Sequence, residues 1–203
     1  GFRINRAGDD AAGLAISENL RAQIRGLQQA ERNAQDGVSL VQVAEGGLQE
    51  VSNILIRLRE LAVQASSDTV GPTERKFLGV EFDALLNEID RIANATEYNR
   101  IPLLNGTAAV FDIQVGTRNN PNIDRLTFFD TSSADVNVVA LGLNLASISD
   151  KTSAQNSLSA IDNSIISVSA IRADFGAMQN RLQSVMNNIA ISIEIMSAAH
   201  SRI

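Results

Sequence analysis

The stretch GLQQAERNAQDGVSLVQVAEGGLQEVSNILIRLRELAVQA, residues 26–65, decides the fold of this chain. Apolar or small residues recur in it every seven positions, in two tracks that lie three residues apart. The first track, which starts upstream, is Leu20, Leu27, Ala34, Val41, Leu48, Leu55 and Ala62, and the second is Ala30, Gly37, Ala44, Val51, Leu58 and Ala65. A heptad pattern of this length is typical of a long helix that packs along another long helix. We therefore predict a long N-terminal helix within residues 1–66, from about Asp9 to Ser66, whose seam contains Leu48, Val51, Leu55 and Leu58.

A second heptad series lies at the other end of the chain and supplies the partner. It consists of Ile161, Val168, Phe175, Leu182, Ile189 and Met196. We predict a C-terminal helix over residues 154–203, with Phe175, Leu182 and Ile189 in its seam. Two heptad helices at opposite ends of a chain, separated by a hairpin, indicate an antiparallel pair.

A shorter helix is predicted between them. The segment SSDTVGPTERK, residues 66–76, interrupts the first helix, because Gly71 ends a helix and Pro72 suits the first turn of the next. The second helix spans residues 72–95. Its apolar stripe is Leu78, Phe82, Leu85, Ile89 and Ile92.

Residues 98–145 change the period and predict a β-hairpin with loops. In the segment AVFDIQVG, residues 109–116, two sets of residues alternate, as in a strand: Val110, Asp112 and Gln114 on one side, and Phe111, Ile113 and Val115 on the other. The segment LTFFD, residues 126–130, is predicted to form a second strand after a loop. The predicted fold class is mainly α: an elongated antiparallel long-helix bundle of three helices with a small β-hairpin insert. We expect one rod domain over residues 1–203.

Composition argues against several functional classes. The net charge is −6, and no basic run is present, which argues against nucleic acid as a partner. Cysteine is absent, so disulfides and thiolate metal sites are excluded. No apolar run approaches the roughly 20 residues that span a bilayer. His200, the single histidine, is interpreted as an exposed helical residue. The pairs Asp9–Asp10 and Glu88–Asp90 are interpreted as helix-terminal acids rather than metal ligands. We predict no enzyme activity, no catalytic residue, no metal and no cofactor.

Longer blocks carry a family resemblance. They are GFRINRAGDDAAGLAISENLRAQIRGLQQAERNAQDGVSLVQVAEGGLQEV, RLRELAVQAS, LNEIDRIANATEYN, IPLLNG, DIQVG, ADFGAMQNRLQSVMNNI and SAAHSRI. In this order they closely resemble bacterial flagellin. The resemblance implies a structural subunit of the flagellar filament, used in motility, that assembles with other flagellin subunits. It also implies an extracellular location in the bacterial flagellum, reached through the flagellar type III export machinery and its chaperone without a cleaved signal peptide.

The resemblance covers one layer of the flagellin subunit. The chain is similar to the D1 layer, and the terminal segments of the inner D0 tube look absent from both ends. It starts without Met, which fits an excised fragment. On this interpretation, contacts with other subunits are lost or weakened, and the chain alone is expected to stay monomeric. Export and chaperone binding would use the missing ends.

The resemblance also implies recognition by Toll-like receptor 5, an innate immune receptor. The matching positions are Arg57, Leu61 and Glu81. Arg57 and Leu61 are four residues apart and so share a helix face. Ile56 departs from the family pattern, since enteric flagellins usually carry a hydrogen-bonding Gln there, and we expect it to affect receptor affinity.

Two alternatives stay open from the sequence. One is the related hook–filament junction protein, which shares the N-terminal helix pattern. The other is a flagellin-like protein at the cell surface that binds a polysaccharide or another ligand. In that case Arg118, Asn119, Asn120 and Arg125, in the loop of the hairpin, would contact acidic sugars.

Overall fold

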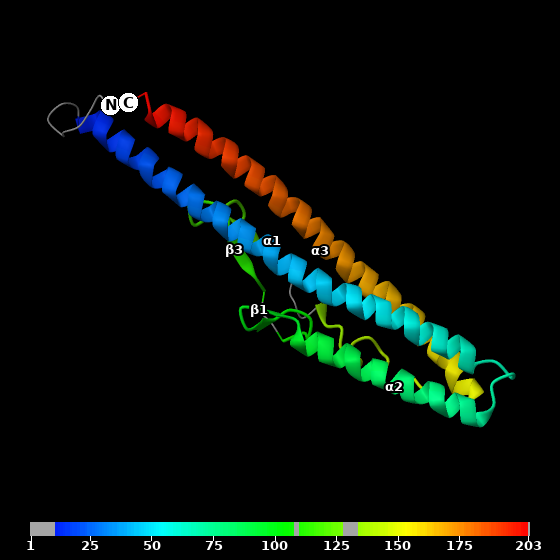
Figure 1. The fold of residues 1–203 in the computed structure, drawn as a ribbon. Helices are drawn as coiled ribbons and strands as arrows, with labels where there is room; N and C mark the ends of the chain where they lie inside the picture. The colour runs from blue at the N-terminus through cyan, green and yellow to red at the C-terminus, as the bar shows by residue number, and fades with distance from the viewer. Residues whose placement is uncertain (1–10, 108–109, 128–133, 203) are drawn as a thin grey trace. The chain divides into compact units, whose positions relative to one another are not determined.

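A computed structural model describes residues 11–107, 110–127 and 134–202 (Figure 1). The helical residues predicted before Ala11, the Asp9–Asp10 pair and parts of the predicted strands lie outside these ranges. The chain divides into two compact units. Unit 1 comprises Gly1–Ser39, Asp112–Phe128 and Met178–Ile203, and unit 2 comprises Leu40–Phe111 and Phe129–Ala177. Each unit is described separately.

Three helices dominate the described chain. They are α1 (Ala11–Ala65), α2 (Pro72–Ala95) and α3 (Lys151–His200). The prediction of a mainly α chain with three helices and a small β insert is confirmed. α3 begins three residues before the predicted start at Ala154. The reason is an N-cap: the Asp150 carboxylate accepts hydrogen bonds from the backbone N–H and the hydroxyl of Ser153, at 2.9 and 2.7 Å.

Two antiparallel ribbons complete the described structure. β3 (Asp112–Gln114) pairs with β4 (Arg125–Thr127), with Ile113 opposite Leu126, and forms the predicted hairpin. β1 (Glu97–Tyr98) pairs with β2 (Ile101–Pro102) through a two-residue turn that the sequence analysis did not predict.

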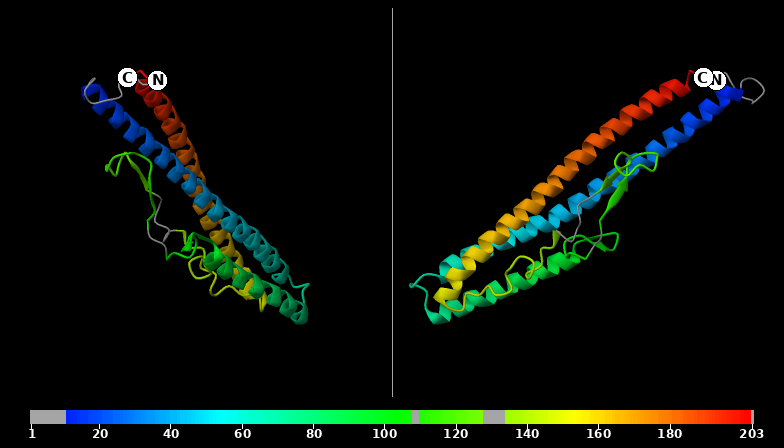
Figure 2. Two further views of the ribbon diagram at one scale, coloured as in Figure 1. Left: turned by 60° about the vertical axis from the view of Figure 1, so that its left-hand side comes forward. Right: turned by 180° about the vertical axis from the view of Figure 1, so that it is seen from behind.

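Unit 1 holds the first part of α1, the β3–β4 hairpin and the last part of α3. The two helix segments are antiparallel, because Ser17 contacts His200 at 3.2 Å while Gly37 lies against Leu182. The hairpin lies beside α1, as both views of Figure 2 show. The Asn33 carboxamide fixes it there by donating to the backbone oxygen of Gln114 at 3.0 Å.

Unit 2 holds the rest of α1 with α2 and the start of α3. Arg57 of α1 pairs with Glu81 of α2, and Arg59 pairs with Asp162 of α3, both at 2.7 Å. Side chains two positions apart on a helix, such as Arg57 and Arg59, point in directions that differ by about 200° around its axis. α1 therefore has a neighbouring helix on each of two sides. The core between the helices is apolar. Its largest fully buried side chains include Leu48, Leu55, Leu58, Leu61, Phe82, Ile89 and Phe175.

A loop over residues 134–150 covers part of unit 2. Its backbone N–H at Val138 donates to the Asp90 carboxylate at 2.7 Å. The hydroxyl of Ser164 in α3 donates to the Leu141 backbone oxygen at 2.8 Å. Asp90 is therefore a structural acceptor, while Glu88 pairs with Arg91 one turn further along α2 at 2.6 Å.

Candidate functional site

The predicted receptor-recognition residues Arg57 and Glu81 form an ion pair on the surface of unit 2. Arg57 Nε lies 2.7 Å from Glu81 Oε1, and Arg57 Nη1 lies 2.9 Å from Glu60 Oε2. About half of each side chain is exposed. The hydrogen bond to Glu81, followed by that to Glu60, raises the pKa of Arg57, and the hydrogen bond from Arg57 lowers the pKa of Glu81. The pair thus presents both charges to solvent in a fixed arrangement.

Leu61, the third predicted recognition residue, is fully buried. It follows Arg57 by one helical turn and so lies on the same side of α1, the side on which Arg57 pairs with Glu81 of α2. Ile56, in contrast, is 50% exposed beside Arg57. The structure therefore brings Arg57 and Glu81 together on the surface and places Leu61 in the core beneath them.

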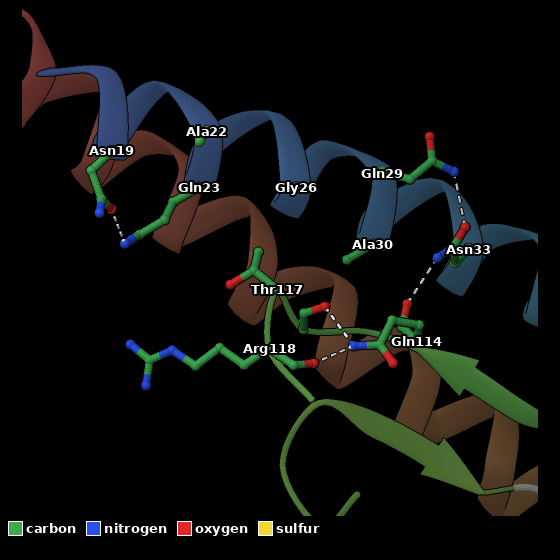
Figure 3. A pocket seen from close by; sticks show the side chains of 11 residues that line it. Asn19, Ala22, Gln23, Gly26, Gln29, Ala30, Asn33, Gln114, Thr117 and Arg118 are labelled. Carbon is green, nitrogen blue, oxygen red and sulfur yellow. Dashed lines mark hydrogen bonds between the residues drawn. The ribbon is translucent and has the colours of Figure 1, made fainter. Parts of the chain in front are cut away.

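A second candidate site is a groove of about 520 Å³ in unit 1, between α1 and the hairpin (Figure 3). Polar carboxamides and small residues line it, and no Asp or Glu is among them. The lining residues are Asn19, Ala22, Gln23, Gly26, Gln29, Ala30, Asn33, Gln114, Gly116, Thr117 and Arg118.

Hydrogen bonds hold the hairpin side of this groove. The Gln114 carboxamide donates to the backbone oxygens of Gly116 and Arg118, at 2.9 and 2.8 Å. Asn33 binds the Gln114 backbone from α1. The Arg118 guanidinium has no ion-pair partner within the described residues, and Figure 3 shows it apart from the other lining side chains. The groove therefore offers one unpaired positive charge.

The other predicted ligand-loop residues form hydrogen bonds within the loop. The Arg125 guanidinium donates to Asn119 Oδ1 at 2.5 Å. The Asn120 backbone N–H donates to the buried Asp124 carboxylate at 3.1 Å. Among the four predicted residues, Arg118 is the one that lines the groove.

Sequence reasoning did not find two further surface features. The first is the carboxamides that α1 contributes to the groove, for which the helical spacing of Asn19, Gln23 and Asn33 would have been the signal. The second is the exposure of Phe77 and Val80, which lie outside the predicted α2 stripe and are 70% and 67% exposed.

The predicted seam residues occupy the core. Their exposed fractions are at most 4%, and they are Leu48, Val51, Leu55, Leu58, Phe175, Leu182 and Ile189. His200 is half-buried and lies 3.2 Å from the Ser17 hydroxyl. In the part of the chain that the structure describes, no three His, Cys, Asp or Glu residues gather as metal ligands, and no helix is long and apolar enough to cross a membrane.

Comparisons with known proteins identify the class. Residues 1–109 match the family model of the bacterial flagellin N-terminal helical region, and residues 158–203 match that of the C-terminal helical region. A flagellin of Halalkalibacterium halodurans is 48% identical over the whole chain, which spans 73% of that protein. A Bacillus subtilis flagellin is 42% identical over the whole chain, which spans 76% of that protein. A Treponema phagedenis flagellar filament 33 kDa core protein is 38% identical over the whole chain, which spans 74% of it.

Solved structures agree on the fold. Bacillus cereus flagellin superposes with a TM-score of 0.68 at 31% identity, covering 78% of this chain and 88% of that one. A putative flagellar hook-associated protein from Vibrio parahaemolyticus gives 0.77 at 15% identity, covering 98% and 100%, which shows the fold alone. The protein is therefore of the structural, filament-forming class. The chain belongs to the flagellin family, and its function is that of a structural subunit of the flagellar filament.

Proposed function

We propose that this filament subunit works in the extracellular flagellum, and that the Arg57–Glu81 pair is a recognition surface for Toll-like receptor 5. The observation that carries the receptor proposal is the fixed, half-exposed ion pair between α1 and α2. An Arg fork and a carboxylate held side by side offer a partner both donors and acceptors without further ordering of side chains. Leu61 contributes by packing beneath the pair, not by contact with a receptor.

Export by the flagellar type III machinery belongs to the same proposal. Its support is family membership, since the relatives that match over the whole chain are flagellins and filament core proteins. Secretion of the protein should stop in a host that lacks this apparatus and continue in one that lacks only the general secretory pathway. Continued secretion without the apparatus contradicts this part.

Binding to the purified receptor ectodomain tests the recognition surface. The variant is Arg57→Ala, and the matched control is Arg59→Ala, which also removes an exposed, ion-paired arginine of α1 but on the side facing α3. We expect Arg57→Ala to weaken binding at least about thirtyfold, the range of an interface hot spot, and Arg59→Ala to leave it near the wild-type value. Equal affinities for wild type and Arg57→Ala overturn the proposal.

A further inference from the structure

A turn of unit 2 holds the single Asn-Gly pair of the chain, Asn105–Gly106. The residue before it is anchored, because the Leu104 backbone oxygen accepts a hydrogen bond from the Val136 N–H at 3.0 Å. Gly106 has a φ of 71°, in the left-handed region that glycine enters without strain. Its backbone N–H makes no hydrogen bond to another described residue. Within the described structure, this nitrogen is therefore not engaged and lies next to the Asn105 carboxamide in sequence.

The turn itself polarises the Asn105 carboxamide. Its Oδ1 accepts hydrogen bonds from the Thr107 hydroxyl at 2.6 Å and from the Thr107 backbone N–H at 3.2 Å. Both donors lie at the oxygen that gains negative charge when a nucleophile adds to the carboxamide carbon, so they stabilise that charge. The Asn105 Nδ2 donates to Asn94 Oδ1 at 3.4 Å, a long hydrogen bond that holds the amide nitrogen weakly.

We propose that Asn105 is a site of spontaneous deamidation, in which the chain supplies its own nucleophile. The Gly106 backbone nitrogen gives its proton to water or hydroxide and bonds to Asn105 Cγ. The Cγ–Nδ2 bond then breaks, and the amide nitrogen takes up a proton from water and leaves as ammonia. Water opens the resulting succinimide at either carbonyl and returns a proton to the Gly106 nitrogen, which gives aspartate or isoaspartate. The net reaction consumes one water and releases one ammonia, and nothing is oxidised or reduced.

The product places a new carboxylate close to Asp135. A β-carbon built on Gly106 would meet Asp135 Oδ2 at 2.8 Å, so the Asp135 carboxylate lies against the turn. Asp135 has no ion-pair partner among the described residues. A second negative charge beside it is repelled, and isoaspartate also lengthens the backbone by one carbon atom. Both effects weaken the hydrogen bond from Val136 to Leu104, which holds the loop over residues 134–150 to this turn.

Peptide mass spectrometry of the incubated, folded protein tests the reaction. Trypsin releases residues 101–118, in which Asn105 is the single Asn, so a mass gain of about 1 Da in this peptide reports its conversion. Labelling by an isoaspartate methyltransferase identifies the rearranged product. At mildly alkaline pH we expect Asn105 to convert at least about tenfold faster than Asn156 and Asn163, because α3 engages the backbone N–H that follows each of them. Conversion of Asn105 that is no faster than theirs overturns the proposal.

Thr107→Val tests the contribution of the turn, since it keeps the shape of the side chain and removes the hydroxyl donor. In the folded protein we expect it to slow the conversion about fivefold, the effect of one hydrogen bond on a rate. In urea-unfolded protein, the variant and wild type should convert at the same rate. The matched control is Thr127→Val, an exposed threonine of β4 in the other unit, which should leave the conversion unchanged. Equal rates for Thr107→Val and wild type in the folded state contradict the assistance by the turn, as does the same loss in urea.

Hydrogen exchange of the Val136 amide, followed by NMR, tests the consequence. We expect this amide to exchange at least about threefold faster in incubated wild-type protein than in fresh protein, because local opening becomes easier. Asn105→Gln is the control, since its longer side chain closes the corresponding ring much more slowly, and incubation should leave its exchange unchanged. Unaltered exchange at Val136 in fully converted protein overturns the weakening of the loop.

Discussion

The Arg75 guanidinium of α2 donates its Nε–H to the backbone oxygen of Ala65, the last residue of α1, at 2.9 Å. Nη2 donates to the backbone oxygens of Val70 and Ser67, at 2.9 and 3.2 Å. The final carbonyls of a helix have no partners within it and carry partial negative charge. One buried cation thus caps α1 and holds the turn that leads into α2.

Replacing Arg75 should lower the free energy of unfolding. Arg75→Met keeps an apolar stem but removes three charge-assisted hydrogen bonds and leaves their carbonyl acceptors in a region of low exposure. We expect the free energy of unfolding to fall by about 3 kcal/mol, measured by urea denaturation. The control is Arg91→Met, which removes an exposed arginine paired with Glu88 in its own helix and should change stability little. Similar losses in both variants contradict the capping role.

Two adjacent glycines of α1 should respond in opposite ways to alanine. A β-carbon on Gly46 meets no atom within 4 Å, whereas one on Gly47 would lie 2.6 Å from Thr96 Oγ1 and 2.9 Å from Leu104 Cδ1. Gly46→Ala should stabilise the protein by up to about 1 kcal/mol through helix propensity. Gly47→Ala should destabilise it by about 1–3 kcal/mol because the close packing must rearrange. Thermal unfolding of the two variants is the measurement, and stabilisation by Gly47→Ala would falsify the assigned packing.

The helices and the seam could be predicted because heptad spacing directly reports which positions face a neighbouring helix. Leu55, Leu58 and Phe175 are accordingly buried. Leu61 shows the limit of this reasoning. A single seam describes a helix with one neighbour, but α1 has α2 on one side and α3 on another, so it buries a wider face than one heptad seam.

The β1–β2 ribbon escaped prediction for a different reason. Each strand has two residues, too few to show alternation, and the turn reads Asn99–Arg100 instead of the usual Asn-Gly. At the candidate site, the sequence predicts that Arg118 lies in a loop with Asn119 and Asn120. It does not predict which of these side chains form hydrogen bonds, because that depends on the fold of the loop. The groove needs residues about 80 positions apart, such as Asn33 and Gln114, which periodicity does not connect.

The β1–β2 turn yields a third prediction. Asn99 and Arg100 have φ of 50° and 63°, in the left-handed region, where residues with a β-carbon other than Asn and Asp are strained. Arg100→Gly should stabilise the protein by about 0.5–1 kcal/mol, since relief of strain exceeds the added freedom of the unfolded chain. Arg100→Ala is the control, because it removes the same guanidinium but keeps the β-carbon, and no gain is expected. Chemical denaturation distinguishes the two, and an equal gain in both would assign the effect to the charge.

The Asp150 N-cap at the start of α3 should make the stability of the protein depend on pH in the acidic range. Asp150 accepts hydrogen bonds from the backbone N–H and hydroxyl of Ser153, and these bonds lower the pKa of its carboxyl. Because the folded pKa lies below the unfolded value of about 3.9, the ionised cap stabilises the fold fully above that pH. The contribution is lost as the pH falls from about 4 through the folded pKa.

Melting temperatures of wild type and Asp150→Ala at pH 7 and at pH 2.5 measure this contribution. We expect Asp150→Ala to melt several degrees lower at pH 7, because the N-cap acceptor and its charge near the positive end of the helix are both lost. At pH 2.5 the difference should shrink, since protonation has already weakened the cap in wild type. Thr152→Ala, an exposed and uncharged change in the same turn, should shift the melting temperature equally at both pH values. A difference between wild type and Asp150→Ala that stays constant with pH means that the ionised carboxylate does not act as the cap.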